Sequence, residues 1–102
     1  MAWTKIDTEE VTGPDDQRWE IDLLTGATKF VSPEGVELRA GVAGKKQYGV
    51  KASAHRGEDH QFEVVAWVPS PHVAAAKTAV MKEARRRIDQ GDWTPSADYE
   101  LR

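Results

Sequence analysis

The chain has 102 residues, of which 39% are hydrophobic and 30% charged, and its formal net charge is −3. This length suits one domain, and the absence of cysteine excludes disulfides, thiolate metal sites and thiol nucleophiles. No run of about 18 apolar residues offers a transmembrane helix, and the first residues lack a signal-peptide pattern, so we expect a cytoplasmic protein without membrane contact.

The N-terminal segment carries a strand pattern followed by turn formers. Residues 3–11 alternate in part between apolar and polar side chains, which predicts a strand. Residues 12–16 contain Gly, Pro and two Asp, which favours a turn. Since chain ends are often poorly held, residues 1–17 are also a candidate for a flexible end.

Residues 18–32 have the pattern of a β-hairpin. Apolar and polar residues alternate in the first arm, and Thr25-Gly26 at the centre suits a tight turn, because glycine tolerates positive φ. In this register Asp22 lies opposite Lys29, and an opposite-charge pair across two strands is favourable. The sequence therefore predicts two short paired strands here.

The middle of the chain predicts a turn, a short strand and a loop. Residues 32–35 read Ser-Pro-Glu-Gly, a turn, and residues 36–38 read as a strand. Residues 40–46 contain two Gly and two Lys and predict a connecting loop. This loop lacks the glycine and lysine spacing of a phosphate-binding P-loop.

Residues 47–69 predict the clearest hairpin. Apolar residues alternate along both arms, and a loop around residues 56–58 with an odd number of residues places both apolar sets on one face. The opposite face then carries Lys51, His55, Glu63, Val65 and Trp67. Gly57 would supply the positive φ that a bulged turn needs.

A helix is predicted over residues 71–90. Ser70 is a favourable N-cap, Pro71 suits the first helical position, and Gly91 suits the C-cap. Helical spacing gathers a buried face of six residues: Val73, Ala76, Val80, Met81, Ala84 and Ile88. The outer face carries Lys82, Arg85 and Arg86. Residues 92–102 are either a flexible end or a short strand at 99–101.

These elements predict an α+β fold: an antiparallel β-meander of four to five strands with one long C-terminal helix packed on one face. We expect a single domain over residues 1–102, with 1–17 and 92–102 as its candidate flexible ends. A single helix covers only one face of such a sheet. The other face is therefore left open, or is covered by the N-terminal or C-terminal segment.

Residue types for catalysis are present without a catalytic arrangement. His55 and His60 flank the predicted turn with Glu58 and Asp59 between them, but their spacing matches no known metal motif, and turn chemistry explains the acids. The hydroxyl residues lie in no nucleophile motif. We therefore expect no enzyme, no catalytic residue, no cofactor and no metal.

Charge is segregated along the chain, which raises nucleic-acid binding as an alternative. Residues 1–44 carry four basic and nine acidic side chains, whereas residues 45–87 carry nine basic and four acidic ones. Cations beside an exposed aromatic on a sheet can bind phosphates and stack bases, although the overall acidity argues against it. The candidates for this alternative are Lys45, Lys46, Lys51, Trp67, Arg85 and Arg86.

The lead interpretation is a small non-enzymatic binding or regulatory protein that acts through protein contacts. Its docking surface would be the open sheet face, because exposed aromatic patches often mark interfaces. The partner would be another protein or a second copy of the chain, and no small-molecule substrate is evident. The residues predicted to bind it are Lys51, Val65, Trp67, Lys82, Arg85 and Arg86.

Overall fold

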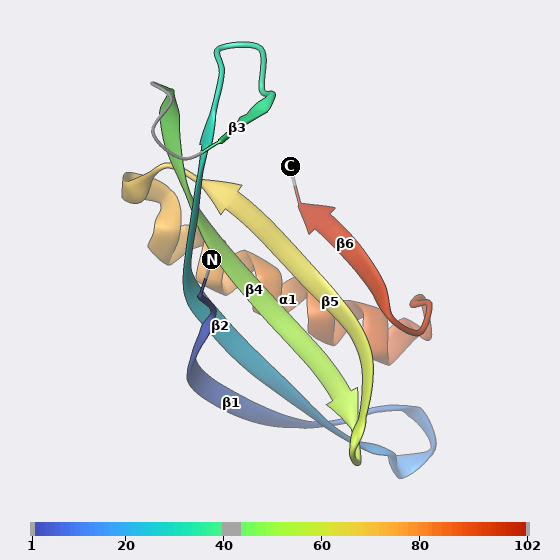
Figure 1. Cartoon of the computed structure of the whole chain (residues 1–102). Helices are drawn as coiled ribbons and strands as arrows, with labels where there is room; N and C mark the ends of the chain where they lie inside the picture. The colour runs from blue at the N-terminus through green and yellow to red at the C-terminus, as the bar shows by residue number, and fades with distance from the viewer. Residues whose placement is uncertain (1, 40–43, 102) are drawn as a thin grey trace.

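The computed structural model describes residues 2–39 and 44–101, apart from the side chains of Asp15, Asp59 and His60 (Figure 1). It is an α+β fold in which one helix lies along one face of a six-stranded, mostly antiparallel sheet. The predicted fold class is confirmed, with one strand more than the four to five expected. No helix among the described residues is long and apolar enough to cross a membrane.

The strands follow the order β1-β2-β4-β5-β6, and β3 pairs with the C-terminal end of β2. Neighbours are antiparallel except β5 and β6, which are parallel because α1 connects them. The chain therefore departs from a simple meander at its last strand. The strands are β1 (Thr4–Thr12), β2 (Arg18–Val31), β3 (Glu37–Leu38), β4 (Lys45–Arg56), β5 (Asp59–Val68) and β6 (Ala97–Leu101). The helical segments are η1 (Pro14–Asp16), η2 (Ser70–His72) and α1 (Val73–Gln90).

The predicted hairpin within residues 18–32 is wrong, because β2 runs through this range as one strand. Gly26 has a φ of +104°, but it lies at a bulge between Thr25 and Thr28 rather than at a turn. The partner of Asp22 is Ser53 of β4, not Lys29. A local pattern could not distinguish the two outcomes, because a tight turn and a bulge both use a glycine with positive φ.

The hairpin predicted over residues 47–69 is confirmed as β4 and β5. Gly57 in its turn has a φ of +65°, and a register shift next to His55 places Ala54 opposite Phe62. Both apolar sets therefore face α1, as the alternation required. The predicted loop over 40–46 is wrong at Lys45 and Lys46, which begin β4, and residues 40–43 lie outside the described residues.

The helix prediction is largely confirmed. α1 ends at Gln90, and the predicted C-cap Gly91 has a φ of +67° and donates its backbone N–H to the carbonyls of Arg87 and Ile88. Ser70 is not an N-cap, because it belongs to the 3-10 turn η2, in which the His72 N–H donates to the Pro69 carbonyl at 3.0 Å. α1 itself then begins at Val73.

The core lies between α1 and the sheet. The residues that alternate along β2, β4 and β5 are buried against the helix face predicted from periodicity, with Val73 only partly buried. Aromatic contacts extend this core to the C-terminal segment, since the rings of Trp93 and Tyr99 each lie 5.9 Å from that of Phe62. Residues 1–17 and 92–102, the candidate flexible ends, thus contribute β1 and β6 to the sheet.

Candidate functional site

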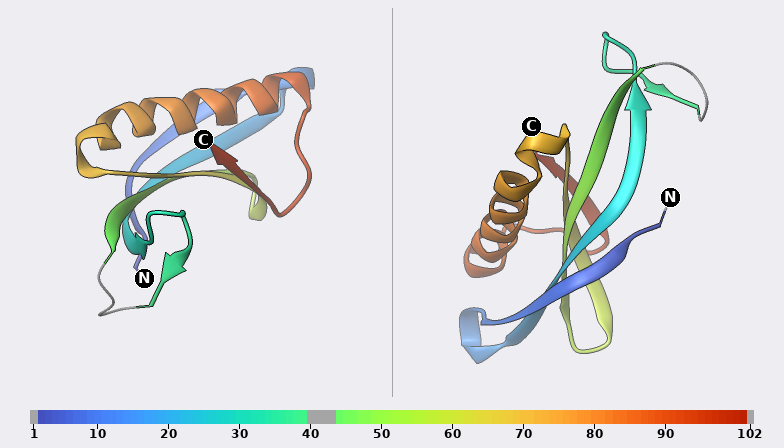
Figure 2. Two further views of the ribbon diagram at one scale, coloured as in Figure 1. Left: turned by 90° about the horizontal axis from the view of Figure 1, so that it is seen from above. Right: turned by 90° about the vertical axis from the view of Figure 1, so that its left-hand side faces the viewer.

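The sheet face turned away from α1, here called the open face, brings together three of the predicted binding residues. Strand pairing places Lys51 beside Val65 and Gly49 beside Trp67, so Lys51, Val65 and Trp67 share this face as predicted. Figure 2 shows that α1 lies along the other face only. Val65 and Trp67 are half-buried rather than fully exposed.

The N-terminal segment supplies a second tryptophan to the open face. The rings of Trp3 and Trp67 lie 5.7 Å apart at 59°. The Lys29 Nζ lies 4.4 Å from the ring of Trp67, and the Lys51 Nζ lies 4.4 Å from the ring of Trp3. Each indole therefore has an ammonium group at cation–π distance. We call the four residues Trp3, Lys29, Lys51 and Trp67 the tryptophan platform.

Gly49 is the floor of the tryptophan platform. A Cβ built at Gly49 would lie 2.6 Å from Cη2 of Trp3 and 2.9 Å from Cζ3 of Trp67. A side chain at this strand position would push both indoles away from the sheet. Glycine inside a strand often marks such a close approach, and the sequence interpretation did not use this signal.

A hollow of about 200 Å³ adjoins the tryptophan platform. Its lining combines both indoles and Val65 with charged groups, among which Lys51 and Glu63 form a 3.1 Å ion pair, and it includes Asp98 of β6. The volume lies below the roughly 300–1,000 Å³ of most small-molecule pockets. The hollow therefore suits one side chain of a partner better than a metabolite.

The predicted helix residues are not brought to the open face. Lys82, Arg85 and Arg86 lie on α1, on the other side of the sheet (Figure 2). Arg85 Nη1 lies 2.6 Å from a carboxylate oxygen of Glu9, and Arg86 Nε lies 2.7 Å from one of Glu83. These arginines are therefore already paired with acids, while Lys82 is exposed.

The lysines at the start of β4 point to opposite faces, because successive strand residues alternate. Lys46 lies over the ring of Tyr48, with 5.2 Å between its Nζ and the ring centroid. Lys45 shares the open face with Gly49 and Lys51 by alternation. The structure therefore divides the six nucleic-acid candidates among both sheet faces and the helix.

The ion pairs of Glu83 with Arg86 and Arg87, near the C-terminal end of α1, give a pH-dependent prediction. Hydrogen bonds from Arg86 lower the pKa of the Glu83 carboxyl below its usual value, and Arg87 acts in the same direction. Because this pKa is lower in the folded chain, the interaction stabilises the fold above the unfolded glutamate pKa of about 4.3. The contribution is lost as the pH falls through the folded pKa.

We expect Glu83→Gln to lower the free energy of unfolding at pH 7 by about 0.5–1 kcal/mol, since the Arg86 side chain is 40% exposed and water screens the ion pair. Urea denaturation of both proteins at pH 7 and pH 3 measures it, and the difference should shrink at pH 3. Glu34→Gln, at an exposed turn, is the control. A difference between wild type and Glu83→Gln that is equal at both pH values would contradict the assignment.

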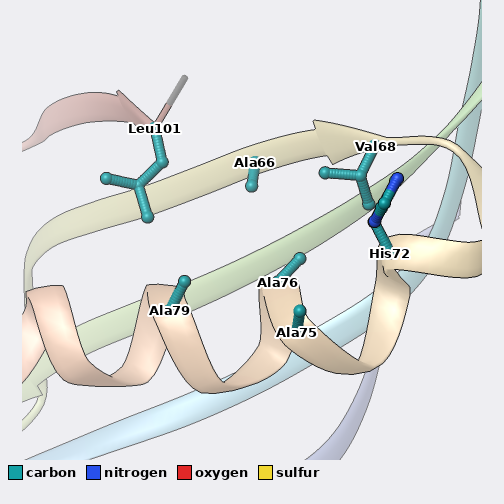
Figure 3. Close-up of a pocket in the computed structure, with 7 residues that line it drawn as sticks. All are labelled: Ala66, Val68, His72, Ala75, Ala76, Ala79 and Leu101. Atoms are coloured by element: carbon teal, nitrogen blue, oxygen red, sulfur yellow. The ribbon is translucent and has the colours of Figure 1, made fainter.

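An apolar groove lies between the start of α1 and strands β5 and β6 (Figure 3). Its volume is about 270 Å³, and Figure 3 shows alanines of α1 on one side, Leu101 at one end and His72 at the other. His72 is the single polar residue of its lining. The groove thus offers no set of converging polar groups for catalysis. The lining residues are Ala66, Val68, His72, Ala75, Ala76, Ala79 and Leu101.

The structure gives His55 different neighbours from those considered in the sequence. The side chains of Asp59 and His60, which the sequence grouped with His55 at the turn, lie outside the described residues. Instead, His55 Nε2 lies 3.1 Å from Oδ2 of Asp22 and 3.7 Å from Oε2 of Glu20. Both acids lie on β2. The hairpin predicted over residues 18–32 had paired the two halves of this segment with each other rather than with β4.

No family model, no curated protein and no solved structure matches this chain.

Proposed function

We propose that the chain is a non-enzymatic binding protein that docks a protein partner on its open face. The observation that carries this proposal is the tryptophan platform, in which Trp3 and Trp67 lie against Gly49 beside a hollow of about 200 Å³. Tryptophans in this setting are the side chains most enriched among residues that dominate binding energy. A partner side chain entering the hollow would contact both indoles.

The charges around the tryptophan platform favour a partner segment that presents an apolar side chain beside a carboxylate. No ion pair is found for Lys29 or Lys45 among the described residues, and both lie on the open face with Trp67. A carboxylate beside a partner side chain that contacts Trp67 would meet the Lys29 ammonium group, which lies 4.4 Å from that ring. Such charge complementarity selects partners and speeds their association.

The paired charges elsewhere support protein over nucleic acid as the ligand. Arg85 and Arg86 are engaged by Glu9 and Glu83, and the open face also carries Glu20, Asp22 and Glu63. A phosphate backbone would meet few free cations and several carboxylates there, although phosphate neutralisation provides most of the affinity in nucleic-acid binding. The absence of cysteine supports a cytoplasmic setting, which is part of the same proposal.

The proposal is tested with a displayed library of random peptides selected on the purified protein. We expect enriched peptides to carry an aromatic or aliphatic residue next to Asp or Glu. Trp67→Ala should weaken the best peptide at least about 30-fold, the effect of losing a dominant interface residue. Lys29→Glu should also weaken the binding of this peptide, because it reverses the charge beside Trp67. Val36→Ala changes an exposed residue outside the platform and should leave the affinity unchanged.

Two outcomes would contradict the proposal. The first is that no peptide distinguishes the wild-type protein from a folded Trp67→Ala variant. The second is that labelled oligonucleotides bind instead, with an affinity that falls by orders of magnitude as salt rises from 50 to about 200 mM. The second outcome would establish the nucleic-acid alternative, whereas peptide binding through indoles should depend only weakly on salt.

A further inference from the structure

The structure places Glu20, Asp22 and His55 together on the open face, and we propose that they bind a divalent transition-metal ion such as Zn²⁺. The proposed function assigns no ligand to this cluster, which differs in its chemistry from the tryptophan platform. The three ligand atoms lie close together, their side chains are unequally buried, and a third strand contacts one of them.

Strand pairing produces the cluster. Glu20 and Asp22 are two residues apart on β2, so their side chains point to the same face. His55 of β4 is the direct cross-strand partner of Glu20. Three potential ligands are therefore held by two hydrogen-bonded strands, which is a more rigid support than a loop.

The separations of the donor atoms suit one ion. His55 Nε2 lies 3.1 Å from Asp22 Oδ2 and 3.7 Å from Glu20 Oε2, and all three ligand atoms lie within 4.8 Å of one another. Zinc holds nitrogen and oxygen ligands at about 2.0–2.2 Å, so neighbouring ligand atoms are roughly 3–3.6 Å apart. A small movement of Glu20 would complete three ligand positions around one ion.

Burial distinguishes the roles of the three residues. The side chains of Asp22 and His55 are 19% and 21% exposed, whereas that of Glu20 is 50% exposed. Two ligands are thus held in place, and the third can adjust from solvent. Water can reach the same side and fill the remaining positions, as in zinc sites with three protein ligands.

A contact from β1 orients the Asp22 carboxylate. The Thr8 hydroxyl donates a 2.8 Å hydrogen bond to Oδ1 of Asp22, which leaves Oδ2 directed at His55. Such outer contacts fix the orientation of metal ligands, and their loss typically weakens metal affinity about 10- to 100-fold. Thr8 belongs to the N-terminal strand, so this support exists only once β1 has paired with β2.

The ligand set selects the class of ion. One imidazole nitrogen and two carboxylate oxygens suit Zn²⁺ and neighbouring transition metals, whereas Mg²⁺ and Ca²⁺ prefer oxygen ligands alone. The same contacts would also form a hydrogen-bonded His–Asp pair without an ion. A metal site takes up Zn²⁺ through His55, whereas a hydrogen-bonded His–Asp pair does not.

The test is calorimetric titration of Zn²⁺ into tag-free protein that has been dialysed against a chelator. We expect one ion per chain, with binding weakened more than about 100-fold in His55→Ala and Asp22→Asn, and about 10-fold in Thr8→Val. Glu20→Gln changes the most exposed ligand and replaces the His55 and Asp22 variants in the test if those fail to fold. His72→Ala, an exposed histidine on η2, is the matched control and should bind as wild type.

A second readout is the visible absorption of bound Co²⁺, which should change in His55→Ala because the nitrogen ligand is lost. The proposal is overturned if Zn²⁺ is not taken up stoichiometrically, or if His55→Ala binds as tightly as wild type. It is also overturned if His60→Ala or His72→Ala weakens binding as much as His55→Ala. Equal affinity for Mg²⁺ would likewise exclude an imidazole ligand.

Discussion

Phe62→Ala is expected to lower the free energy of unfolding by about 3–5 kcal/mol, the range for removing a buried aromatic side chain. Phe62 is fully buried, and its ring contacts Trp19 of β2, Trp93 after α1 and Tyr99 of β6 at 5.9–6.0 Å. These three rings come from distant parts of the chain. The substitution therefore leaves a cavity and also loosens the attachment of the C-terminal segment.

Denaturant titration measures this loss, and hydrogen exchange locates it. The β6 amides should lose protection most, because Trp93 and Tyr99 hold this segment on the core through Phe62. Since domains are stable by only about 5–15 kcal/mol, the variant should lose a large fraction of its stability. Val36→Ala is the control, since Val36 is 62% exposed and should change stability by less than about 0.5 kcal/mol. A loss below about 1 kcal/mol for Phe62→Ala would contradict this packing.

Gly49→Ala is expected to disrupt the tryptophan platform and to reduce peptide binding as strongly as Trp67→Ala. The new Cβ would lie 2.6 Å from Trp3 and 2.9 Å from Trp67, so both indoles must move. Replacing glycine inside a strand would otherwise stabilise the fold by about 0.5–1 kcal/mol. We expect the clash to outweigh this gain, with a net loss of about 1–3 kcal/mol, as in other overpacked sites.

A double-mutant cycle with Trp3→Ala isolates the clash. Once the Trp3 ring is absent, Gly49→Ala should cost less than in the wild-type background, and near-UV circular dichroism should report the displaced indoles. Additive effects of the two substitutions would show that Gly49 and Trp3 are not coupled. That result would remove Gly49 as the floor of the platform and weaken the proposed docking site.

Local periodicity was sufficient for the features that depend on neighbouring residues. The alternation along residues 47–69 predicted which side chains of β4 and β5 face the helix, and thereby that Lys51, Val65 and Trp67 share a face. Helical spacing and Gly91 predicted the buried face and the end of α1. Side-chain direction in a strand or helix repeats every 2 or about 3.6 residues, so it can be read within a short window.

The remaining features depend on contacts between segments that are distant in the chain. Trp3 and Trp67 are 64 positions apart in sequence, and their contact requires β1, β2, β4 and β5 to pair in one register. His55 meets Glu20 and Asp22 only because β2 continues through a bulge at Gly26 and pairs with β4, where the local pattern suggested a turn. The pairing of Arg85 with Glu9 depends in the same way on where β1 lies.

The physical reason is that a strand pattern specifies one face of a strand but not its neighbour in the sheet. Bulges and crossover connections cost little free energy locally. They are favoured only when burial across the whole sheet outweighs the entropy lost in closing long loops. The faces and the helix of this protein therefore follow from its local pattern. The tryptophan platform, the Glu20–Asp22–His55 cluster and the neutralised arginines exist only in the folded sheet, because each requires the register that the complete set of strands selects.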